Sequence, residues 1–498
     1  MLALALVAGC SDGGEVGGSG SSTTQDDQGT TVAEPTRPDG PTASFEGPIE
    51  GGRGTFLGAA TDTSADLEAA GYYESEYFAT GTAVSYTGET PPDGNYALKE
   101  ADSADYATRI VVRRPEDPAQ FNGVVLLEWL NVSGGADAAP DWTYLRPEIL
   151  REGYAWVGVS AQLIGIEGGP VAVEVPGAEA LGGGKGIKAL DPERYGDLSH
   201  PGDSFAFDIY TQVGRALRDP GGTDPLDGLE VTDVLAVGES QSAFALTTYY
   251  NGVQPLTDAF DGFLIHSRGG APMPIEAPSG YNDIVASIAL EPTAFRTDSD
   301  TPVMVVETEG DLLAYINYFP ARQPEADNLR VWEIAGSAHA DLDQVGEAFE
   351  STLGCSAPIN RGQQEYVLRA ALAGLTNWVE TGDAPPSAAV LEIDAGGDAP
   401  SFVLDEVGNV TGGVRTPVVE APVAVLSGLA PPGSSVVCLL FGSTVAMDAG
   451  QLASMYDDAD DYLAQYTAAT DAAIEAGFLL EADREAILDE ADPSGLAG

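Results

Sequence analysis

The feature that most constrains this chain is a serine placed between a strand-like run and a helix-like run. Val234-Leu235-Ala236-Val237 is continuous and apolar, Gly238-Glu239-Ser240 follows it, and Gln241–Leu246 has the composition of a helix. A sharp strand-to-helix turn of this kind lifts one serine clear of a sheet and exposes its hydroxyl. The pattern therefore predicts an α/β arrangement and makes Ser240 the candidate nucleophile.

A second Gly-x-Ser-x-Ser match shows why the context matters. Gly17-Gly18-Ser19-Gly20-Ser21 lies in a polar, Gly/Ser-rich segment with no strand before it and no helix after it. This composition is typical of a flexible linker. Near Ser240 the second small position is Ser242 instead of the more usual glycine, and serine is still small enough for that place. We therefore interpret the copy at Ser240 as the catalytic motif.

The charge balance excludes two classes of partner. The 498 residues include 78 Asp and Glu but 21 Lys and Arg, for a formal net charge of −57. Phosphate binding needs a basic surface, so nucleic acid is excluded as a partner, and so is electrostatic attraction to anionic lipid. The acid is spread along the chain and favours a strongly solvated surface. With 43% hydrophobic residues, the chain can still bury a large core.

The N-terminus predicts export and a lipid anchor. Met1–Gly9 is an apolar run too short to cross a bilayer, and Val7-Ala8-Gly9-Cys10 resembles a bacterial lipobox, although no Lys or Arg precedes it. In a lipobox the cysteine is lipidated and becomes the mature N-terminus. We predict a signal over 1–10, lipidation of Cys10, a disordered polar linker over 11–41, and an extracytoplasmic, lipid-anchored location on the bacterial cell envelope. The alternative is an ordinary apolar N-terminus.

The other two cysteines suit an exported chain. Once Cys10 carries lipid, Cys355 and Cys438 remain as an even pair, which predicts a disulfide between them. The alternative is two buried thiols, because Cys438 lies in the apolar run 436–440. No Cys/His spacing resembles a zinc site, and we predict neither a metal nor a cofactor.

Buried strands and helices alternate along most of the chain. Strands are expected at 76–86, 108–113, 123–130, 154–160, 262–266, 302–307 and 329–334, besides the run before Ser240, and helices at 144–152, 204–217 (with Asp203 as N-cap) and 363–380. The Gly/Pro-rich segments 165–201 and 270–299 are expected to be inserted loops. This alternation predicts a mostly parallel sheet with helices on both faces. We place a catalytic domain at 42–382 and a C-terminal extension at 383–498, with helices at 453–475 and 481–491, packed on the core.

A serine needs a base to take its proton, and histidine is the usual base. In folds with this turn the order along the chain is serine, acid, histidine. His200 precedes the serine, and His266 follows it too closely for an acid to lie between them. His339 lies in a loop just after the last predicted strand and is therefore the predicted base.

The acid is expected at the end of the strand 302–307. Three carboxylates lie there, and Asp311 falls where the acid is usually carried. Glu309 is the alternative acid, whereas Glu307 ends the strand. The acid would hold the imidazole in one tautomer and stabilise the imidazolium that forms.

An oxyanion hole needs two N–H donors aimed at one point. The backbone N–H of Gln241, where the helix begins, is the first candidate. The second is expected from the loop in 128–135, whose glycines permit a close backbone approach. Asn131 or Val132 is the candidate residue in that loop.

Together these elements resemble the α/β-hydrolase superfamily. More narrowly, the chain is similar to a group of exported bacterial alpha/beta hydrolase domain proteins, over about Phe45 to the C-terminus. The residues that carry this likeness are Glu128–Gly135, His200-Pro201-Gly202-Asp203, Gly238–Ser242, His266–Gly270 and Gly336–Asp341. The resemblance implies the α/β-hydrolase fold, with inserted loops and a C-terminal extension, and a serine hydrolase.

The expected activity is hydrolysis of a small-molecule or glycan ester through an acyl-enzyme. Arg268 is expected to clamp a substrate carboxylate or to pair with a nearby acid, and His200 to line the pocket or cap the following helix. Enzymes that cleave glucuronoyl esters carry an arginine directly after the serine, where this chain has Gln241. The alternative function is a non-catalytic ligand-binding protein on the same scaffold.

Overall fold

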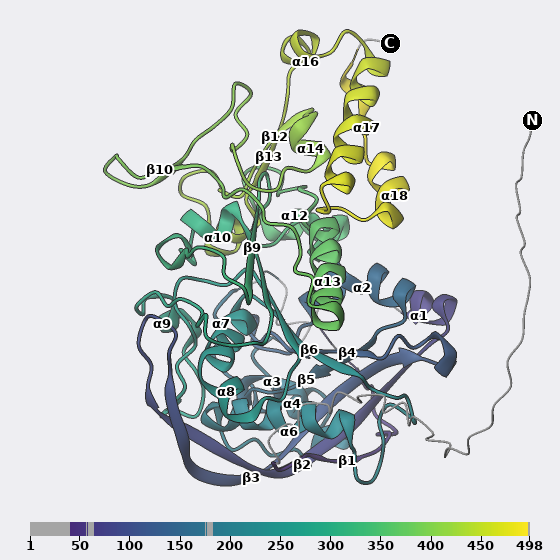
Figure 1. The fold of residues 1–498 in the computed structure, drawn as a ribbon, viewed down its shortest axis with the longest axis vertical. Helices are drawn as coiled ribbons and strands as arrows, with labels where there is room; N and C mark the ends of the chain where they lie inside the picture. Colours follow the sequence, from purple (N-terminus) through teal and green to yellow (C-terminus); the bar gives the residue numbers. More distant parts are fainter. Residues whose placement is uncertain (1–39, 56, 58–63, 175, 177–182, 497–498) are drawn as a thin grey trace, which may run out of the picture. The chain divides into compact units, whose positions relative to one another are not determined.

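The computed structural model describes residues 40–55, 57, 64–174, 176 and 183–496. In them, one sheet has the strand order β1-β2-β3-β5-β4-β6-β7-β8-β9 (Figure 1). The strands are β1 Ser44–Glu46, β2 Tyr72–Glu89, β3 Ala97–Pro115, β4 Val124–Trp129, β5 Ala155–Val159, β6 Asp233–Glu239, β7 Gly262–His266, β8 Val303–Thr308 and β9 Leu329–Ile334. The strands from β5 to β9 in this order are parallel, whereas β1, β2 and β3 pair antiparallel with their neighbours. The predicted mostly parallel sheet is confirmed.

The central strands are buried on both faces, as their continuous apolar runs predict. Every residue of β4 is buried. Val125 and Leu127 point into one hydrophobic core, and Val124 and Leu126 point into the other. This is the two-residue alternation of a pleated strand, so the sheet needs helices on both sides.

Helices supply both of these layers. α6 and α7 pack on the first core, and α2 and α13 pack on the second. The helices are α1 Ser64–Ala70, α2 Pro140–Glu152, α3 Leu163–Glu167, α4 Gly186–Leu190, α5 Pro192–Tyr195, α6 Ala206–Arg218, α7 Gln241–Thr248, α8 Gln254–Thr257, α9 Ile284–Ile288, α10 Glu309–Leu313, α11 Leu342–Val345, α12 Glu347–Leu353, α13 Gln364–Thr381, α14 Pro417–Glu420, α15 Val436–Phe441, α16 Ala449–Met455, α17 Ala459–Glu475 and α18 Arg484–Asp489.

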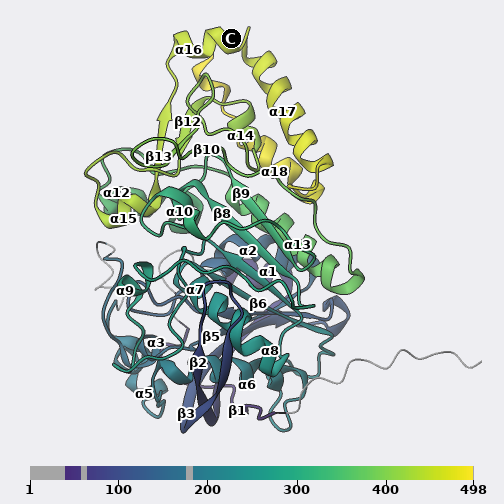
Figure 2. The ribbon, with the colours of Figure 1, turned by 60° about the vertical axis from the view of Figure 1, so that its left-hand side comes forward.

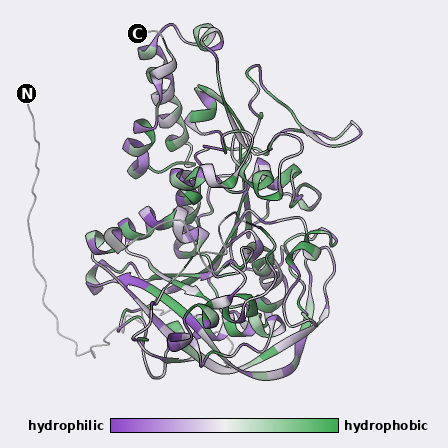
Figure 3. Ribbon diagram, turned by 180° about the vertical axis from the view of Figure 1, so that it is seen from behind, coloured by the Kyte–Doolittle hydropathy of each residue, from purple (hydrophilic) through white to green (hydrophobic). Residues whose placement is uncertain are grey.

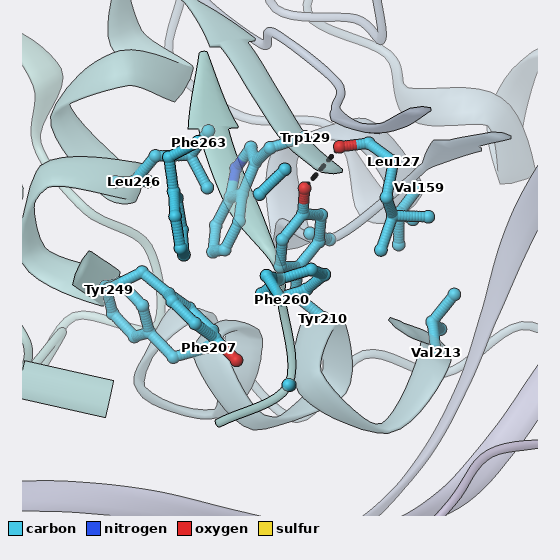
Figure 4. Close-up of a cluster of buried hydrophobic side chains, with 14 of the residues drawn as sticks. Leu127, Trp129, Val159, Phe207, Tyr210, Val213, Leu246, Tyr249, Phe260 and Phe263 are labelled. Atoms are coloured by element: carbon cyan, nitrogen blue, oxygen red, sulfur yellow. Dashed lines mark hydrogen bonds between the residues drawn. The ribbon is translucent and has the colours of Figure 1, made fainter. Parts of the chain in front are cut away.

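An aromatic cluster fixes α6 beneath the carboxyl end of β4 (Figure 4). The ring of Tyr210 lies 5.0 Å from the rings of both Trp129 and Phe260. Its hydroxyl donates to the carbonyl of Leu127. A buried hydroxyl without a hydrogen-bond partner would lower the free energy of unfolding by about 1–3 kcal/mol. The cluster therefore holds the strand end from which the candidate oxyanion loop leaves.

Two element predictions are wrong in extent. β2 and β3 are 18 and 19 residues long and form one long antiparallel ribbon. Residues 97–107 are mostly exposed and contain no continuous apolar run, so their hydropathy does not predict a strand; they form one because they pair with β2. The helix expected at 453–475 is broken between α16 and α17, because Asp458 caps a new helix by accepting from the N–H of Asp461 at 2.9 Å.

Asp203 is not the predicted N-cap of its helix. Its carboxylate accepts from the backbone N–H groups of Leu163 and Asn282, each at 2.8 Å. Leu163 lies just before the segment 165–201 and Asn282 lies within the segment 270–299, the two segments expected to be inserted loops. Asp203 therefore connects the two segments, and a long-range role of this kind leaves no local sequence pattern.

Residues beyond 382 pack at the β9 edge of the sheet. Val414 forms a parallel bridge with Ile334. The N–H of Val414 donates to the carbonyl of Glu333 at 2.7 Å, and the N–H of Ala335 donates to the carbonyl of Val414 at 3.0 Å. This pairing covers an edge that would otherwise expose unpaired backbone groups. Two small hairpins follow, β10 Ile393–Asp394 with β11 Ser401–Phe402, and β12 Ala424–Ser427 with β13 Ser443–Ala446. Both segments, 42–382 and 383–498, lie in one compact unit, Pro38–Gly498.

The C-terminal helices differ in character from the sheet. Figures 1 and 2 both show α16, α17 and α18 beyond β9. In Figure 3 hydrophobic residues concentrate on the central strands and their flanking helices, whereas the C-terminal helices carry both kinds of residue. Among the described residues, no helix combines the length and apolarity needed to span a membrane. The predicted signal, Cys10 and nearly all of the linker over 11–41 lie outside the described residues.

Candidate active site

Ser240 occupies the turn between β6 and α7 in a strained backbone conformation. Its φ is 59° and its ψ is −120°, a region that costs a non-glycine residue about 1–3 kcal/mol. The N–H of Ser240 donates to the carbonyl of His266 at 2.9 Å, which pins the turn to β7. At Gly238 a Cβ would lie 2.9 Å from atoms of Ser242 and Leu246, so the close packing of α7 on β6 requires a glycine there. The sheet thus presents the Ser240 hydroxyl at its carboxyl edge.

The structure brings together Ser240, His339 and Asp311. His339 follows β9, and its Nε2 lies 2.8 Å from Ser240 Oγ. Its Nδ1 lies 2.6 Å from Asp311 Oδ1, and Asp311 lies in α10, directly after β8. The three side chains therefore follow the carboxyl ends of β6, β8 and β9 in one sheet and form one hydrogen-bonded series.

Asp311 is held rigidly by donors on its other oxygen. Oδ2 accepts from the N–H of Thr308 at 2.6 Å, from the hydroxyl of Thr308 at 2.7 Å and from the hydroxyl of Ser267 at 2.8 Å. The carboxylate is fully buried, and these donors fix its orientation. Asp311 therefore presents its other oxygen, Oδ1, to His339.

Glu309, the alternative acid, points away from His339. Its Oε1 accepts from the N–H of Gly336 at 2.5 Å, and its Oε2 accepts from the N–H of Gly428 at 2.8 Å. Burial raises the pKa of Glu309 to about 7, and the two N–H donors act against this shift. A Cβ on Gly428 would collide with the backbones of Gly310 and Ser337, so the backbones of these three residues lie very close together. Glu309 joins the acid loop, the histidine loop and the C-terminal segment.

A fourth ionisable group, Glu239, lies at the site. Its Oε1 is 3.5 Å from His339 Nε2, and the side-chain amide of Asn131 lies 3.4 Å from its Oε2. Burial raises the pKa of Glu239 to about 7, and the nearby histidines oppose this shift. Sequence reasoning missed Glu239, although its position directly before Ser240 in the serine motif was a usable signal.

The pKa of His339 is raised above its ordinary value. Burial lowers this pKa, but the hydrogen bond and charge of Asp311, with the charge of Glu239, outweigh the burial. His339 is thus a strong base whose protonated form is stabilised. These are the properties that a general base needs in order to take a proton from serine.

The predicted second oxyanion donors are already used within the protein. The N–H of Asn131 donates to the carbonyl of Ala138 at 2.9 Å, and the N–H of Val132 donates to the side-chain oxygen of Gln241 at 3.1 Å. The structure therefore supports neither residue as a free donor. Gln241 begins α7, where the first amides have no partner inside the helix. Its backbone N–H keeps the position predicted for the first donor.

Arg268 and His200 do not lie where substrate binding requires them. The guanidinium of Arg268 is buried over the ring of Phe295 and donates to backbone carbonyls, among them that of Thr293 at 2.6 Å. The expected carboxylate clamp is therefore not supported. The Nε2 of His200 is 2.8 Å from the carbonyl of Ala161, and its Nδ1 accepts from the N–H of Gly202. Both side chains brace loops instead of lining the cavities beside Ser240.

Two cavities meet at Ser240 and His339. The larger has a volume of about 240 Å³, and its apolar wall includes Pro140, Val345, Phe349, Leu353, Leu440 and Phe441. The smaller has a volume of about 20 Å³, and its wall includes Phe244, Ile284, Ile288, Tyr315, Ile316 and Leu440. Leu440 and Phe441 belong to α15, in the C-terminal segment. Sequence reasoning missed this contribution, although the run 436–440 that carries Cys438 was a usable signal.

The predicted disulfide is present beside the larger cavity. Cys355 and Cys438 are joined, with their Cα atoms 5.6 Å apart. Cys355 follows α12, which carries Phe349 and Leu353, and Cys438 lies in α15 beside Leu440. The disulfide therefore links two lining elements that lie far apart in the sequence. Within the described part of the chain, no group of three or more His, Cys, Asp or Glu side chains is placed to hold a metal ion.

A family described as alpha/beta hydrolase domain matches residues 45–489. The chain belongs to this family. Its strand order and parallel sheet agree with the α/β-hydrolase fold class predicted above. No curated protein matches the chain.

The solved structures that match this hydrolase-family chain share little sequence with it. An esterase of Rhizomucor miehei is 11% identical (TM-score 0.31; 65% of this chain and 90% of that chain covered). Est1E of Butyrivibrio proteoclasticus is 10% identical (TM-score 0.28; 54% and 95%). A glucuronoyl esterase of Solibacter usitatus is 12% identical (TM-score 0.26; 60% and 83%).

Proposed function

We propose that this alpha/beta hydrolase is a serine hydrolase of carboxylic esters, with Ser240 as nucleophile, His339 as general base and Asp311 as the acid. The observation that carries the proposal is the unbroken series of 2.8 and 2.6 Å contacts among these three side chains at the mouth of an apolar cavity. An activated serine beside a base that a third group orients is the arrangement used for acyl transfer.

The proposed reaction has two halves. His339 Nε2 takes the proton of Ser240 Oγ while the oxygen attacks the ester carbonyl carbon, and the N–H of Gln241 donates to the oxyanion that forms. The protonated His339 then gives its proton to the leaving alcohol, and an acyl-enzyme remains. In the second half His339 takes a proton from water while the water oxygen attacks the acyl carbonyl carbon. The bond between Ser240 Oγ and the acyl carbon then breaks, Oγ takes the proton back from His339, and the carboxylic acid leaves.

We also propose that the protein is exported and anchored by lipid on Cys10, as its N-terminal sequence predicts. The test is metabolic labelling of the expressed full chain with a fatty-acid analogue, beside a Cys10→Ser variant. Label on the wild type alone supports the anchor. Equal label on both chains, or label on neither, contradicts it.

The test of catalysis is covalent labelling of the full chain in detergent with a fluorophosphonate, which reacts with activated serines. Wild type is expected to be labelled, and Ser240→Ala and His339→Ala are expected to lose the label. Ser242→Ala is the matched control, because Ser242 is buried two residues away and takes no part in the reaction. A folded wild type that does not react, or a Ser240→Ala variant that still does, contradicts the proposal.

A further inference from the structure

From the two cavities that meet at Ser240 we infer a substrate class: uncharged esters with one bulky apolar arm and one very small arm. This inference rests on the proposed ester hydrolysis and adds to it the shape and charge of the substrate. It depends on the sizes, the walls and the charges of the two cavities.

The geometry of an ester makes the two cavities informative. The carbonyl carbon carries one acyl arm and one alkoxy arm, and during attack it must lie beside Ser240 Oγ. Ser240 and His339 line both cavities, so the carbonyl carbon lies where the cavities meet. One arm must then extend into the larger cavity and the other into the smaller.

The sizes of the cavities differ greatly. About 10–15 Å³ of cavity holds a single water molecule, so the smaller cavity, at about 20 Å³, has room for a methyl group. The larger, at about 240 Å³, lies just below the roughly 300–1,000 Å³ of sites for drug-sized ligands. It therefore suits an aliphatic or aromatic group of moderate size.

The walls select for apolar arms. The larger cavity is lined by Val345, Phe349 and Leu353 and by Leu440 and Phe441, and polar side chains are a minority of its lining. Because most of this wall offers no hydrogen bonds, a hydroxyl-rich arm would lose its contacts with water and regain few of them. A glycan arm is therefore disfavoured in this cavity.

The charges select against anionic arms. Among the described residues that line the two cavities, the side chains able to carry charge near neutral pH are Glu239 and His339, and none is Lys or Arg. An arm with a carboxylate would be buried without a counter-ion and would lie near Glu239. Arg268 is buried and does not line either cavity, so it does not supply the missing counter-ion.

Three isomeric esters, which have the same atoms but arms of different size, test the sizes inferred for the two arms. Methyl heptanoate has a bulky acyl arm and a methyl alkoxy arm, hexyl acetate has the reverse, and butyl butanoate has two arms of medium size. We expect kcat/KM for the better of the first two to exceed that for butyl butanoate by about tenfold or more, because the smaller cavity rejects a butyl or propyl group. Which of the two asymmetric esters is faster shows whether the larger cavity takes the acyl or the alkoxy arm.

A carboxylate at the far end of the bulky arm tests the charge. Monomethyl heptanedioate and 6-acetoxyhexanoate are the matched anionic forms of the two asymmetric esters. The anionic form of the better substrate is expected to lose at least about tenfold in kcat/KM. Equal rates for the anionic and neutral forms would overturn the charge argument.

A matched pair of variants tests the larger cavity itself. Val345→Phe fills it from α11 and is expected to reduce turnover of the bulky ester while sparing methyl acetate. Ala348→Phe adds the same side chain at a nearby exposed position and should change neither rate. Equal loss for both esters in Val345→Phe would overturn the assignment of the bulky arm to this cavity.

The outcomes separate this inference from the proposed function. Fluorophosphonate labelling and turnover of methyl acetate, whose two arms are both small, report the serine chemistry alone. If both are retained but butyl butanoate equals its isomers, the substrate class is wrong and the esterase stands. If both are absent in the folded full chain, the proposed function fails and the substrate class fails with it.

Discussion

The two halves of the site are built by different means. Ser240, Asp311 and His339 are each placed by the carboxyl end of a strand, on β6, β8 and β9, and the neighbouring strands fix their spacing. The apolar wall of the larger cavity instead comes largely from α11, α12 and α15, and a disulfide joins the residue pair Cys355, just after α12, and Cys438 in α15. The comparison teaches that the sheet places the proposed catalytic groups, whereas segments outside it shape the cavity beside them.

The largest expected effect comes from breaking the sheet-built half without changing its shape. Asp311→Asn keeps the size of the side chain but favours the wrong imidazole tautomer, so kcat is expected to fall by roughly 10³–10⁴-fold. Steady-state hydrolysis of the best ester measures this fall. Glu309→Gln is the matched comparison, because Glu309 contacts backbone amides and not His339. A comparable loss in Glu309→Gln, with Asp311→Asn active, would reverse the assignment of the acid.

The wall-built half is broken by removing its cross-link. Replacing both Cys355 and Cys438 by serine is expected to lower the free energy of unfolding by about 2–4 kcal/mol, measured by urea denaturation. Below the unfolding transition, kcat/KM for the bulky ester should fall more than that for methyl acetate, because the chemistry does not depend on this wall. Equal losses for both esters would show that the two halves are not separable.

A change in pH dependence sharpens the comparison inside the sheet-built half. His339 must be neutral to accept a proton, and its raised pKa places the acid limb of the kcat/KM profile above the ordinary histidine value of 6.5. Glu239→Gln removes a negative charge 3.5 Å from His339 Nε2, so the acid limb is expected to move to lower pH. An unchanged limb would contradict a role for Glu239 in tuning His339. The exposed Glu347→Gln is the control.

The smallest effect concerns stability. Burial raises the pKa of Glu309 and Asp341 to about 7 and that of Asp141 to about 8. A carboxyl group with a raised folded-state pKa contributes stability below its unfolded value, near 4, which is lost as the pH rises through the folded value. Tm is therefore expected to fall between about pH 5 and 8, by roughly 1 °C for each kcal/mol lost in a unit of this size.

Calorimetry across this range measures that fall. Burial also raises the pKa of Glu307, so Glu307→Gln is expected to flatten the profile. Glu347→Gln should leave it unchanged. A Tm that rises over this range in wild type would refute the role given to these buried carboxyl groups.

The sequence predicted what depends on local pattern. Ser240 stands where an apolar run meets a helix, and His339 is the histidine whose position follows the last strand. The choice between Asp311 and Glu309 depended on orientation, since the two carboxylates leave one short helix in different directions. The sequence therefore favoured Asp311 over Glu309 but could not show which of the two carboxylates faces His339.

What the sequence missed depends on partners far along the chain. The N–H of Val132 is used by the side chain of Gln241, more than a hundred residues later, so its availability could not be read from its own loop. Arg268 looked like a ligand-binding residue, but nearby carbonyls and the ring of Phe295 surround it. Leu440 and Phe441 reach the cavity only through the packing of the C-terminal segment.

The meeting of backbones at Glu309 has a consequence for biosynthesis. The backbone N–H of Gly428 donates one of the two hydrogen bonds that hold the Glu309 carboxylate. A ribosome makes residue 428 long after the serine turn, the acid loop and the histidine loop. A nascent chain can thus complete its sheet while this junction is still open, so the proposed site is completed only after residue 428 has been made and has packed.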